Sequence, residues 1–188
     1  KITIDDGKTF LVEKGFNINN DFEIDGGGKL ILDRKADLNS KTLTADVDVE
    51  INPSNENKHN NALSNFNIIV NKSLTVNRDN NITFKELTLN GALSINYNST
   101  VSDKFTYNGG NITIANGKKL TLKKALIVNA DLTIDDKFDI TEVTSIKVKD
   151  GCTLTINGNL VLAKSLTLDG NIAVSDGKIL TISGGQIT

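Results

Sequence analysis

The chain has 188 residues, of which 38% are apolar and 23% charged, a composition typical of an ordered rather than a disordered protein. Its net charge of −2, with both signs interspersed, predicts no binding to nucleic acid and no attraction to an anionic membrane. Cys152 is the only cysteine, which excludes an internal disulfide and a multi-cysteine metal site. No apolar run approaches the roughly 18 residues of a membrane span, so we expect no membrane insertion.

Short segments of the form apolar–x–apolar recur along nearly the whole chain, and they are the expected strands. Two apolar residues one apart lie on the same face of a strand, with the residue between them on the other face. In chain order, with a weaker strand at 99–101, these segments begin at Ile2, Phe10, Phe16, Phe22, Leu30, Leu38, Leu43, Val49, Leu74, Ile82, Leu87, Leu93, Phe105, Ile112, Leu120, Leu126, Leu132, Phe138, Ile146, Leu154, Leu160, Leu166, Ile172 and Leu180.

Every third segment returns to the same side after about twenty residues, as Leu74, Leu93, Ile112 and Leu132 illustrate. Connectors of about three residues are too short for a helical crossover, and such short strands bury their apolar face only when copies stack. We therefore expect one all-β domain over 1–188, a three-sided parallel β-solenoid with about twenty residues per coil. Its winding is expected to be right-handed, as parallel crossovers nearly always are. Asparagines at equivalent corners are expected to form side-chain ladders.

A second period competes with this one. Residues 112–148 align without gaps on residues 146–182, and each repeat of this longer period contains five strands. Five is not a multiple of three, so this period does not fit a three-sided coil. The twenty-residue period is preferred because it extends over more of the chain.

One segment departs from the regular spacing of the expected strands. Residues 52–65 contain the only proline, Pro53, and the only histidine, His59, and they are expected to form a polar loop inserted at a corner. Both ends of the chain lie in mid-pattern, so the sequence is interpreted as a piece of a longer or processed protein.

On one side of the coil, the outward residue between the two apolar residues of each strand is a candidate binding residue. Parallel stacking places them in a file with a spacing of about 4.8 Å. The β-propensity of threonine is enough to explain such a file, and the alternative is a hydroxyl ladder that binds a regular surface such as a glycan or ice. The file consists of Thr75, Ser94, Thr113, Thr133 and Thr155, followed by Ala173.

A carbohydrate-active β-helix enzyme is the less favoured alternative. Such enzymes gather several carboxylates in one groove, whereas the pairs Asp5–Asp6 and Asp135–Asp136 and the series Asp21, Glu23 and Asp25 are expected on different sides. A lone histidine within a loop also argues against a catalytic triad and against a zinc site. We therefore expect no enzyme activity, no catalytic residue, no metal and no cofactor.

The repeated Leu-Thr-Leu, Ile-Thr-Ile and Leu-Thr-Ile strands, separated by Asn/Asp-Gly-Lys corners, resemble the β-solenoid shafts of bacterial surface proteins. Filamentous-haemagglutinin-like adhesins and autotransporter passengers are the families concerned. The resemblance implies secretion to the bacterial cell surface, an elongated stalk and a role in adhesion. On this basis we expect a structural or adhesive fibre segment that self-associates or stacks on flanking β-solenoid repeats, with a glycan or host surface as a further candidate partner.

Overall fold

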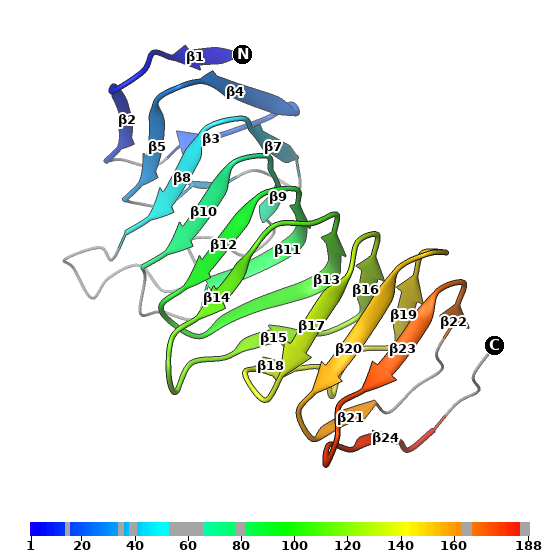
Figure 1. Cartoon of the computed structure of the whole chain (residues 1–188). Helices are drawn as coiled ribbons and strands as arrows, with labels where there is room; N and C mark the ends of the chain where they lie inside the picture. Colours follow the sequence, from blue (N-terminus) through cyan, green and yellow to red (C-terminus); the bar gives the residue numbers. More distant parts are fainter. Residues whose placement is uncertain are drawn as a thin grey trace.

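The computed structural model describes residues 1–13, 16–33, 36–37, 41–52, 66–77, 82–162 and 167–184. Within these ranges the chain forms 24 β-strands and no helix, and every strand pairing is parallel. The strands wind into an elongated coil that runs from the N-terminus to the C-terminus (Figure 1). The expected all-β parallel solenoid is confirmed.

The coil has three faces, which we name A, B and C. Face A contains β1 (Ile2–Ile4), β4 (Phe22–Gly26), β7 (Thr42–Ala45), β9 (Phe66–Val70), the second part of β11 (Ile82–Leu89), the second part of β13 (Ser99–Tyr107), β16 (Ala125–Val128), β19 (Ser145–Val148) and β22 (Thr167–Leu168). Face B contains β2 (Thr9–Val12), β5 (Lys29–Leu32), β8 (Asp48–Ile51), β10 (Ser73–Val76), β12 (Ala92–Ile95), β14 (Ile112–Ile114), β17 (Leu132–Asp135), β20 (Thr153–Asn157) and β23 (Asn171–Val174). Face C contains β3 (Phe16–Asn17), β6 (Ala36–Asp37), the first parts of β11 and β13, β15 (Leu120–Leu122), β18 (Phe138–Asp139), β21 (Leu160–Leu162) and β24 (Leu180–Ile182).

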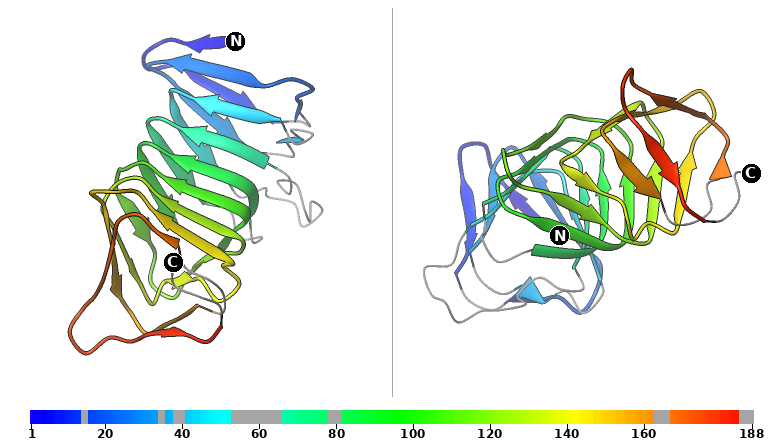
Figure 2. Two further views of the ribbon diagram at one scale, coloured as in Figure 1. Left: turned by 90° about the vertical axis from the view of Figure 1, so that its right-hand side faces the viewer. Right: turned by 90° about the horizontal axis from the view of Figure 1, so that it is seen from below.

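The strand register confirms the period of about twenty residues. On face B, Leu74 lies opposite Leu93, and Leu93 lies opposite Ile112. On face A, Leu126 lies opposite Ile146. Each of these steps advances the chain by one coil, and Figure 2 shows the strands of successive coils lying one above another along the rod. The strand beginnings expected at Leu38 and Leu166 lie outside the described residues.

The core is a stack of apolar side chains that point inward from all three faces. Strands such as β10 and β12 alternate between fully buried and half-exposed residues, as the apolar–x–apolar pattern predicts. Leu74 and Leu93 are fully buried, and Phe84 and Phe105 are the largest of the fully buried side chains. Each coil therefore buries its apolar face against the coils on either side of it.

Side-chain ladders connect successive corners, as expected from the asparagine content. After face A, Asn108 donates from its side-chain amide to Asn90 at 2.6 Å, and Asn129 donates to Asn108 at 2.7 Å. The same ladder continues through Asn71 to Asp46. Because each amide both donates and accepts, one residue type links coil after coil.

The three faces differ in continuity. Face A forms one unbroken ladder from β1 to β22. Among the described strands from β10 onward, face B is interrupted between β14 and β17, which belong to separate sheets, and face C is interrupted between β18 and β21. In this part of the rod, both interruptions involve the coil that contains β17 and β18.

The steps between faces B and C vary in length along the chain. The chain takes six residues from Ile114 to Leu120, but only four over the equivalent corner of the next coil, from Ile134 to Phe138. β18 stays in register with β15, whereas β17 and β14 belong to separate sheets.

The longer self-match, of residues 112–148 on residues 146–182, also reflects corner lengths. Long and short steps between successive strands follow one order from Ile112 onward, and the same order begins again at Ile146. These two residues lie on different faces, because Ile146 pairs with Leu126 on face A whereas Ile112 pairs with Leu93 on face B. The match therefore repeats an order of corners, and the coil itself keeps the twenty-residue period.

The expected polar loop at 52–65 lies outside the described residues except for Asn52. The main-chain N–H of Asn52 donates to the carbonyl of Leu32 at 3.1 Å. Pairing along face B therefore extends one residue beyond β8.

Candidate functional site

The structure divides the predicted hydroxyl file into two. Thr75, Ser94 and Thr113 lie in register on β10, β12 and β14, and Thr133 and Thr155 lie in register on β17 and β20. The expectation of one continuous file is wrong, because the interruption of face B separates Thr113 from Thr133.

The outward file of face B is also mixed in chemistry. Towards the N-terminus it continues from Thr75 through Glu50 and Ile31 to Leu11, whose side chain is 43% exposed. Towards the C-terminus, Thr155 is followed by Ala173. Hydroxyl groups therefore occupy the middle of this face, on both sides of the interruption.

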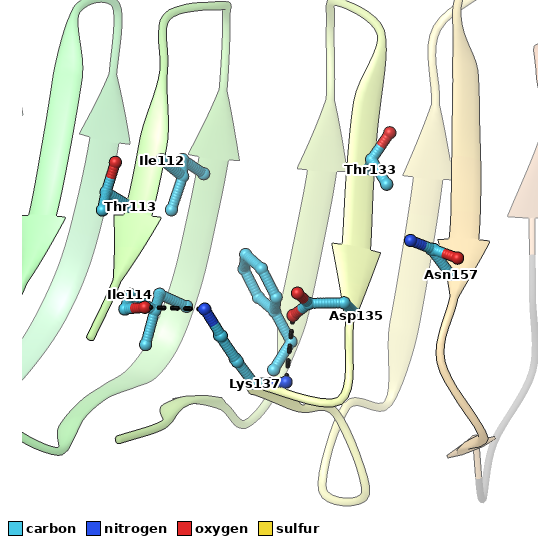
Figure 3. A pocket seen from close by; sticks show the side chains of 8 residues that line it. Ile112, Thr113, Ile114, Thr133, Asp135, Lys137 and Asn157 are labelled. Carbon is cyan, nitrogen blue, oxygen red and sulfur yellow. Dashed lines mark hydrogen bonds between the residues drawn. The ribbon is translucent and has the colours of Figure 1, made fainter. Parts of the chain in front are cut away.

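A hollow of about 220 Å³ lies at the interruption, between β14 and β17. Figure 3 shows Thr113 on one side of this space and Thr133 on the other. It is lined by Ile112, Thr113, Ile114, Thr133, Asp135, Lys137, Phe138 and Asn157. We call it the face B hollow.

Lys137 closes one end of the face B hollow. Its ammonium Nζ reaches back to the carbonyl oxygen of Ile114 at 2.9 Å, bridging the two edges (Figure 3). The main-chain N–H of Lys137 donates to Oδ1 of Asp135 at 2.9 Å, which fixes the carboxylate beside the corner. Two members of the predicted file, Thr113 and Thr133, thus lie beside a carboxylate and an ammonium group.

The sequence pattern did not single out Asp135, Lys137 and Asn157 as members of this site. Corner length gives no signal for it, because the same shortening, from Val76–Ile82 to Ile95–Ser99, occurs where face B is continuous. The site is visible only in the strand pairing, which joins β18 to β15 but does not join β17 to β14.

A second, smaller hollow of about 180 Å³ lies at the interruption of face C, between β18 and β21. Phe138 lines both hollows. Oδ1 of Asp136 accepts a hydrogen bond from the main-chain N–H of Asn159 at 2.9 Å, so this carboxylate braces the neighbouring coil.

Other acidic residues that the sequence drew attention to also act as braces. Oδ1 of Asp21 accepts from the main-chain N–H of Thr42 at 3.0 Å. Asp25 contacts the ammonium of Lys1 at 2.5 Å, and this hydrogen bond, with a further one from Thr3, holds the pKa of Asp25 below its usual value. In the part of the chain that the structure describes, no three His, Cys, Asp or Glu residues come together in a group able to hold a metal ion.

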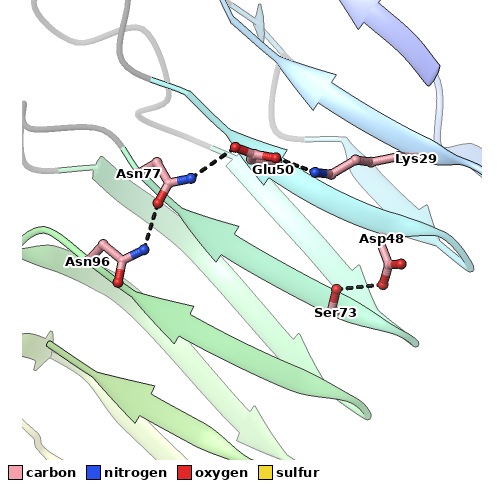
Figure 4. Close-up of polar contacts among 6 residues, drawn as sticks. All are labelled: Lys29, Asp48, Glu50, Ser73, Asn77 and Asn96. Atoms are coloured by element: carbon pink, nitrogen blue, oxygen red, sulfur yellow. Dashed lines mark hydrogen bonds and ion pairs between the residues drawn. The ribbon is translucent and has the colours of Figure 1, made fainter.

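Glu50 is a half-buried carboxylate in the outward file of face B, next to Thr75 on its N-terminal side. It forms an ion pair with Lys29 and accepts a hydrogen bond from the side-chain amide of Asn77 at 2.9 Å (Figure 4). The bond from Lys29 is the main reason why the pKa of Glu50 lies below its usual value, and burial acts in the opposite direction. Asn96 extends the chain of contacts to a further coil by donating to Asn77 at 2.6 Å.

Comparison of the chain with protein-family models, with curated proteins and with solved structures finds no match. No described segment forms a helix with the length and hydropathy of a membrane span.

Proposed function

We propose that this chain is a structural, adhesive segment of a secreted or cell-surface fibre, and that its end coils stack on flanking β-solenoid coils. The next coil comes from the same polypeptide or from another copy of it. The resemblance of the strands and corners to bacterial surface shafts supports the extracellular location. The observation that carries the proposal is the exposed end of the core.

Inward-facing residues of the last described coil lack the burial of their counterparts one coil earlier. Val174 is 44% exposed, although its partner Ile156 in the preceding coil is fully buried. Ile182 is only half-buried, whereas Leu162, which lies opposite it, is fully buried. An apolar core cross-section and unpaired strand edges favour a further coil at this end.

The side-chain contacts support a scaffold rather than a catalytic role. Asn90, Asn108 and Asn129 connect coil to coil, and Asp21 and Asp136 hold main-chain N–H groups of the next coil. These polar groups are engaged in holding the rod together.

Cysteine labelling in the native, full-length protein tests the proposal. In a Cys152→Ser background, Val174→Cys places a thiol on the end of the core and Val161→Cys places one on the flank. The two positions are a matched pair, because their side chains are 44% and 43% exposed in the described structure. Intact cells are treated with a membrane-impermeant maleimide.

We expect the thiol at position 161 to react and the thiol at position 174 to be protected by the stacked coil. Equal labelling of both positions contradicts stacking at this end. Absence of labelling at position 161, with labelling restored after cell lysis, contradicts the surface location.

A further inference from the structure

We propose that the face B hollow is a binding site for one ring of a neutral sugar. The inference goes beyond the fibre role and does not depend on it, because the hollow lies on the flank of the rod rather than at its ends. It rests on the interruption of face B, on the side chains that line the gap and on the size of the gap.

The hollow is bordered by two strand edges that do not pair with each other. Among the described strands, β14 pairs only with β12 and β17 pairs only with β20, so the edges that face the hollow are unpaired. Lys137 satisfies the carbonyl of Ile114 at one end. The remaining main-chain groups along the gap are the kind of fixed donors and acceptors that orient a small polar ligand.

The lining combines polar groups with an apolar part. Thr113 and Thr133 present hydroxyl groups from opposite sides, and Asp135 and Asn157 add a carboxylate and an amide. Hydroxyl and amide groups donate and accept hydrogen bonds, and a carboxylate accepts them, which matches the hydroxyl groups of a sugar. The apolar part consists of Ile112, Ile114 and Phe138, which suit the C–H face of a sugar ring.

The charge and the size of the face B hollow restrict the class of ligand further. The described lining carries one carboxylate, on Asp135, and one ammonium, on Lys137, so the hollow favours a ligand without net charge. The ammonium is already bonded to the Ile114 carbonyl, which leaves it poorly placed to hold an anion. At about 220 Å³ the space is smaller than the roughly 300 Å³ at which pockets for drug-sized ligands begin, and it suits a single ring.

The test uses free glucose, galactose, mannose and N-acetylglucosamine as probes. Saturation-transfer NMR on the 188-residue chain measures binding of each sugar. We expect at least one of them to bind with a Kd on the order of 1 mM, as is typical of a few hydrogen bonds in an open site. Thr133→Val and Asp135→Asn should each weaken that binding at least tenfold.

Thr75→Val is the matched control. It makes the same substitution on the same face, at a position where the strand is paired on both sides. Valine favours strands, so both threonine variants should remain folded, which circular dichroism and thermal melting verify. Failure of all four sugars to bind overturns the proposal. An equal effect of Thr75→Val and Thr133→Val on sugar binding also overturns it.

Discussion

At the scale of single residues, close approach of main chains makes two corner positions specific for glycine. A Cβ atom built on Gly91 would lie 1.8 Å from the carbonyl oxygen of Lys72, and one built on Gly110 would lie 1.8 Å from the carbonyl oxygen of Gly91. Gly110 also has a φ of +96°, which other residues rarely adopt. Lys72, Gly91 and Gly110 occupy the same corner of successive coils, so their turns stack with main chains in direct contact.

Gly91→Ala is therefore expected to destabilise the rod by about 3 kcal/mol, since the clash is with main chain that cannot move without shifting a coil. Gly117→Ala is the control, because a Cβ there would meet nothing within 4 Å and only its φ of +70° opposes the substitution. We expect that control to cost about 1 kcal/mol. Urea unfolding measures both variants, and equal midpoints for the two would contradict the stacked-turn explanation.

Glu50 makes a pH-dependent contribution to stability. Its pKa is lowered in the folded protein, mainly by the hydrogen bond from Lys29. The unfolded chain therefore takes up the proton at a higher pH than the folded one. The contribution is fully present above the usual glutamate pKa, and it is lost as the pH falls through the lowered value of the folded state.

Glu50→Gln should thus be less stable than the parent chain at pH 7, by up to about 1 kcal/mol for a partly exposed ion pair. As the pH falls through the lowered pKa of the folded state, the parent side chain becomes neutral as well, so the gap in unfolding free energy should shrink. Urea titrations at several pH values measure this gap. A gap that stays constant between pH 7 and pH 3 would show that Glu50 acts through shape rather than charge.

At the scale of elements, strands differ according to how many partners they have. Strand β12 on face B pairs with both β10 and β14, whereas β14 and β17 each pair with a described strand on one side only. Main-chain N–H groups at an unpaired edge exchange with solvent through small local motions. The interruption of face B should therefore be detectable in solution as faster exchange of main-chain N–H groups.

Hydrogen–deuterium exchange read by mass spectrometry checks this expectation. Peptides that cover β17 should exchange at least tenfold faster than those that cover β12, which lies on the same face and serves as the control. The same fast exchange is expected for β14. Equal protection of β12, β14 and β17 would mean that face B closes into one ladder in solution.

The strands themselves were largely predictable from alternation of apolar and polar residues. Strands β11 and β13 are the main exception, because the sequence indicated separate short strands where the structure has strands of eight and nine residues. Strand β11 passes from face C to face A through a register shift between Phe84 and Glu86. A shift of this kind turns the chain without Gly or Asn, so no turn residue marks it in the sequence.

At the scale of the whole molecule, a continuous face A holds together a rod that is interrupted on its two other faces. The pairing of β13, β16 and β19 passes the region where β14 separates from β17 and β18 separates from β21. The coil that contains β17 and β18 is thus paired with the following coil on face B, through β20, and with the preceding coil on face C, through β15. This arrangement creates the two hollows without breaking the core.

The sequence by itself determined the solenoid, the twenty-residue coil and the inward residues such as Leu74 and Leu93, because these follow from side-chain alternation within each short strand. It also placed the asparagine ladders at the corners. Only the tertiary structure decided which strands pair across unequal corners, and hence that Thr113 and Thr133 lie on opposite sides of a hollow. Alternation is a local property of each short strand, whereas pairing depends on where a strand lies relative to the neighbouring coil, which is a property of the folded chain.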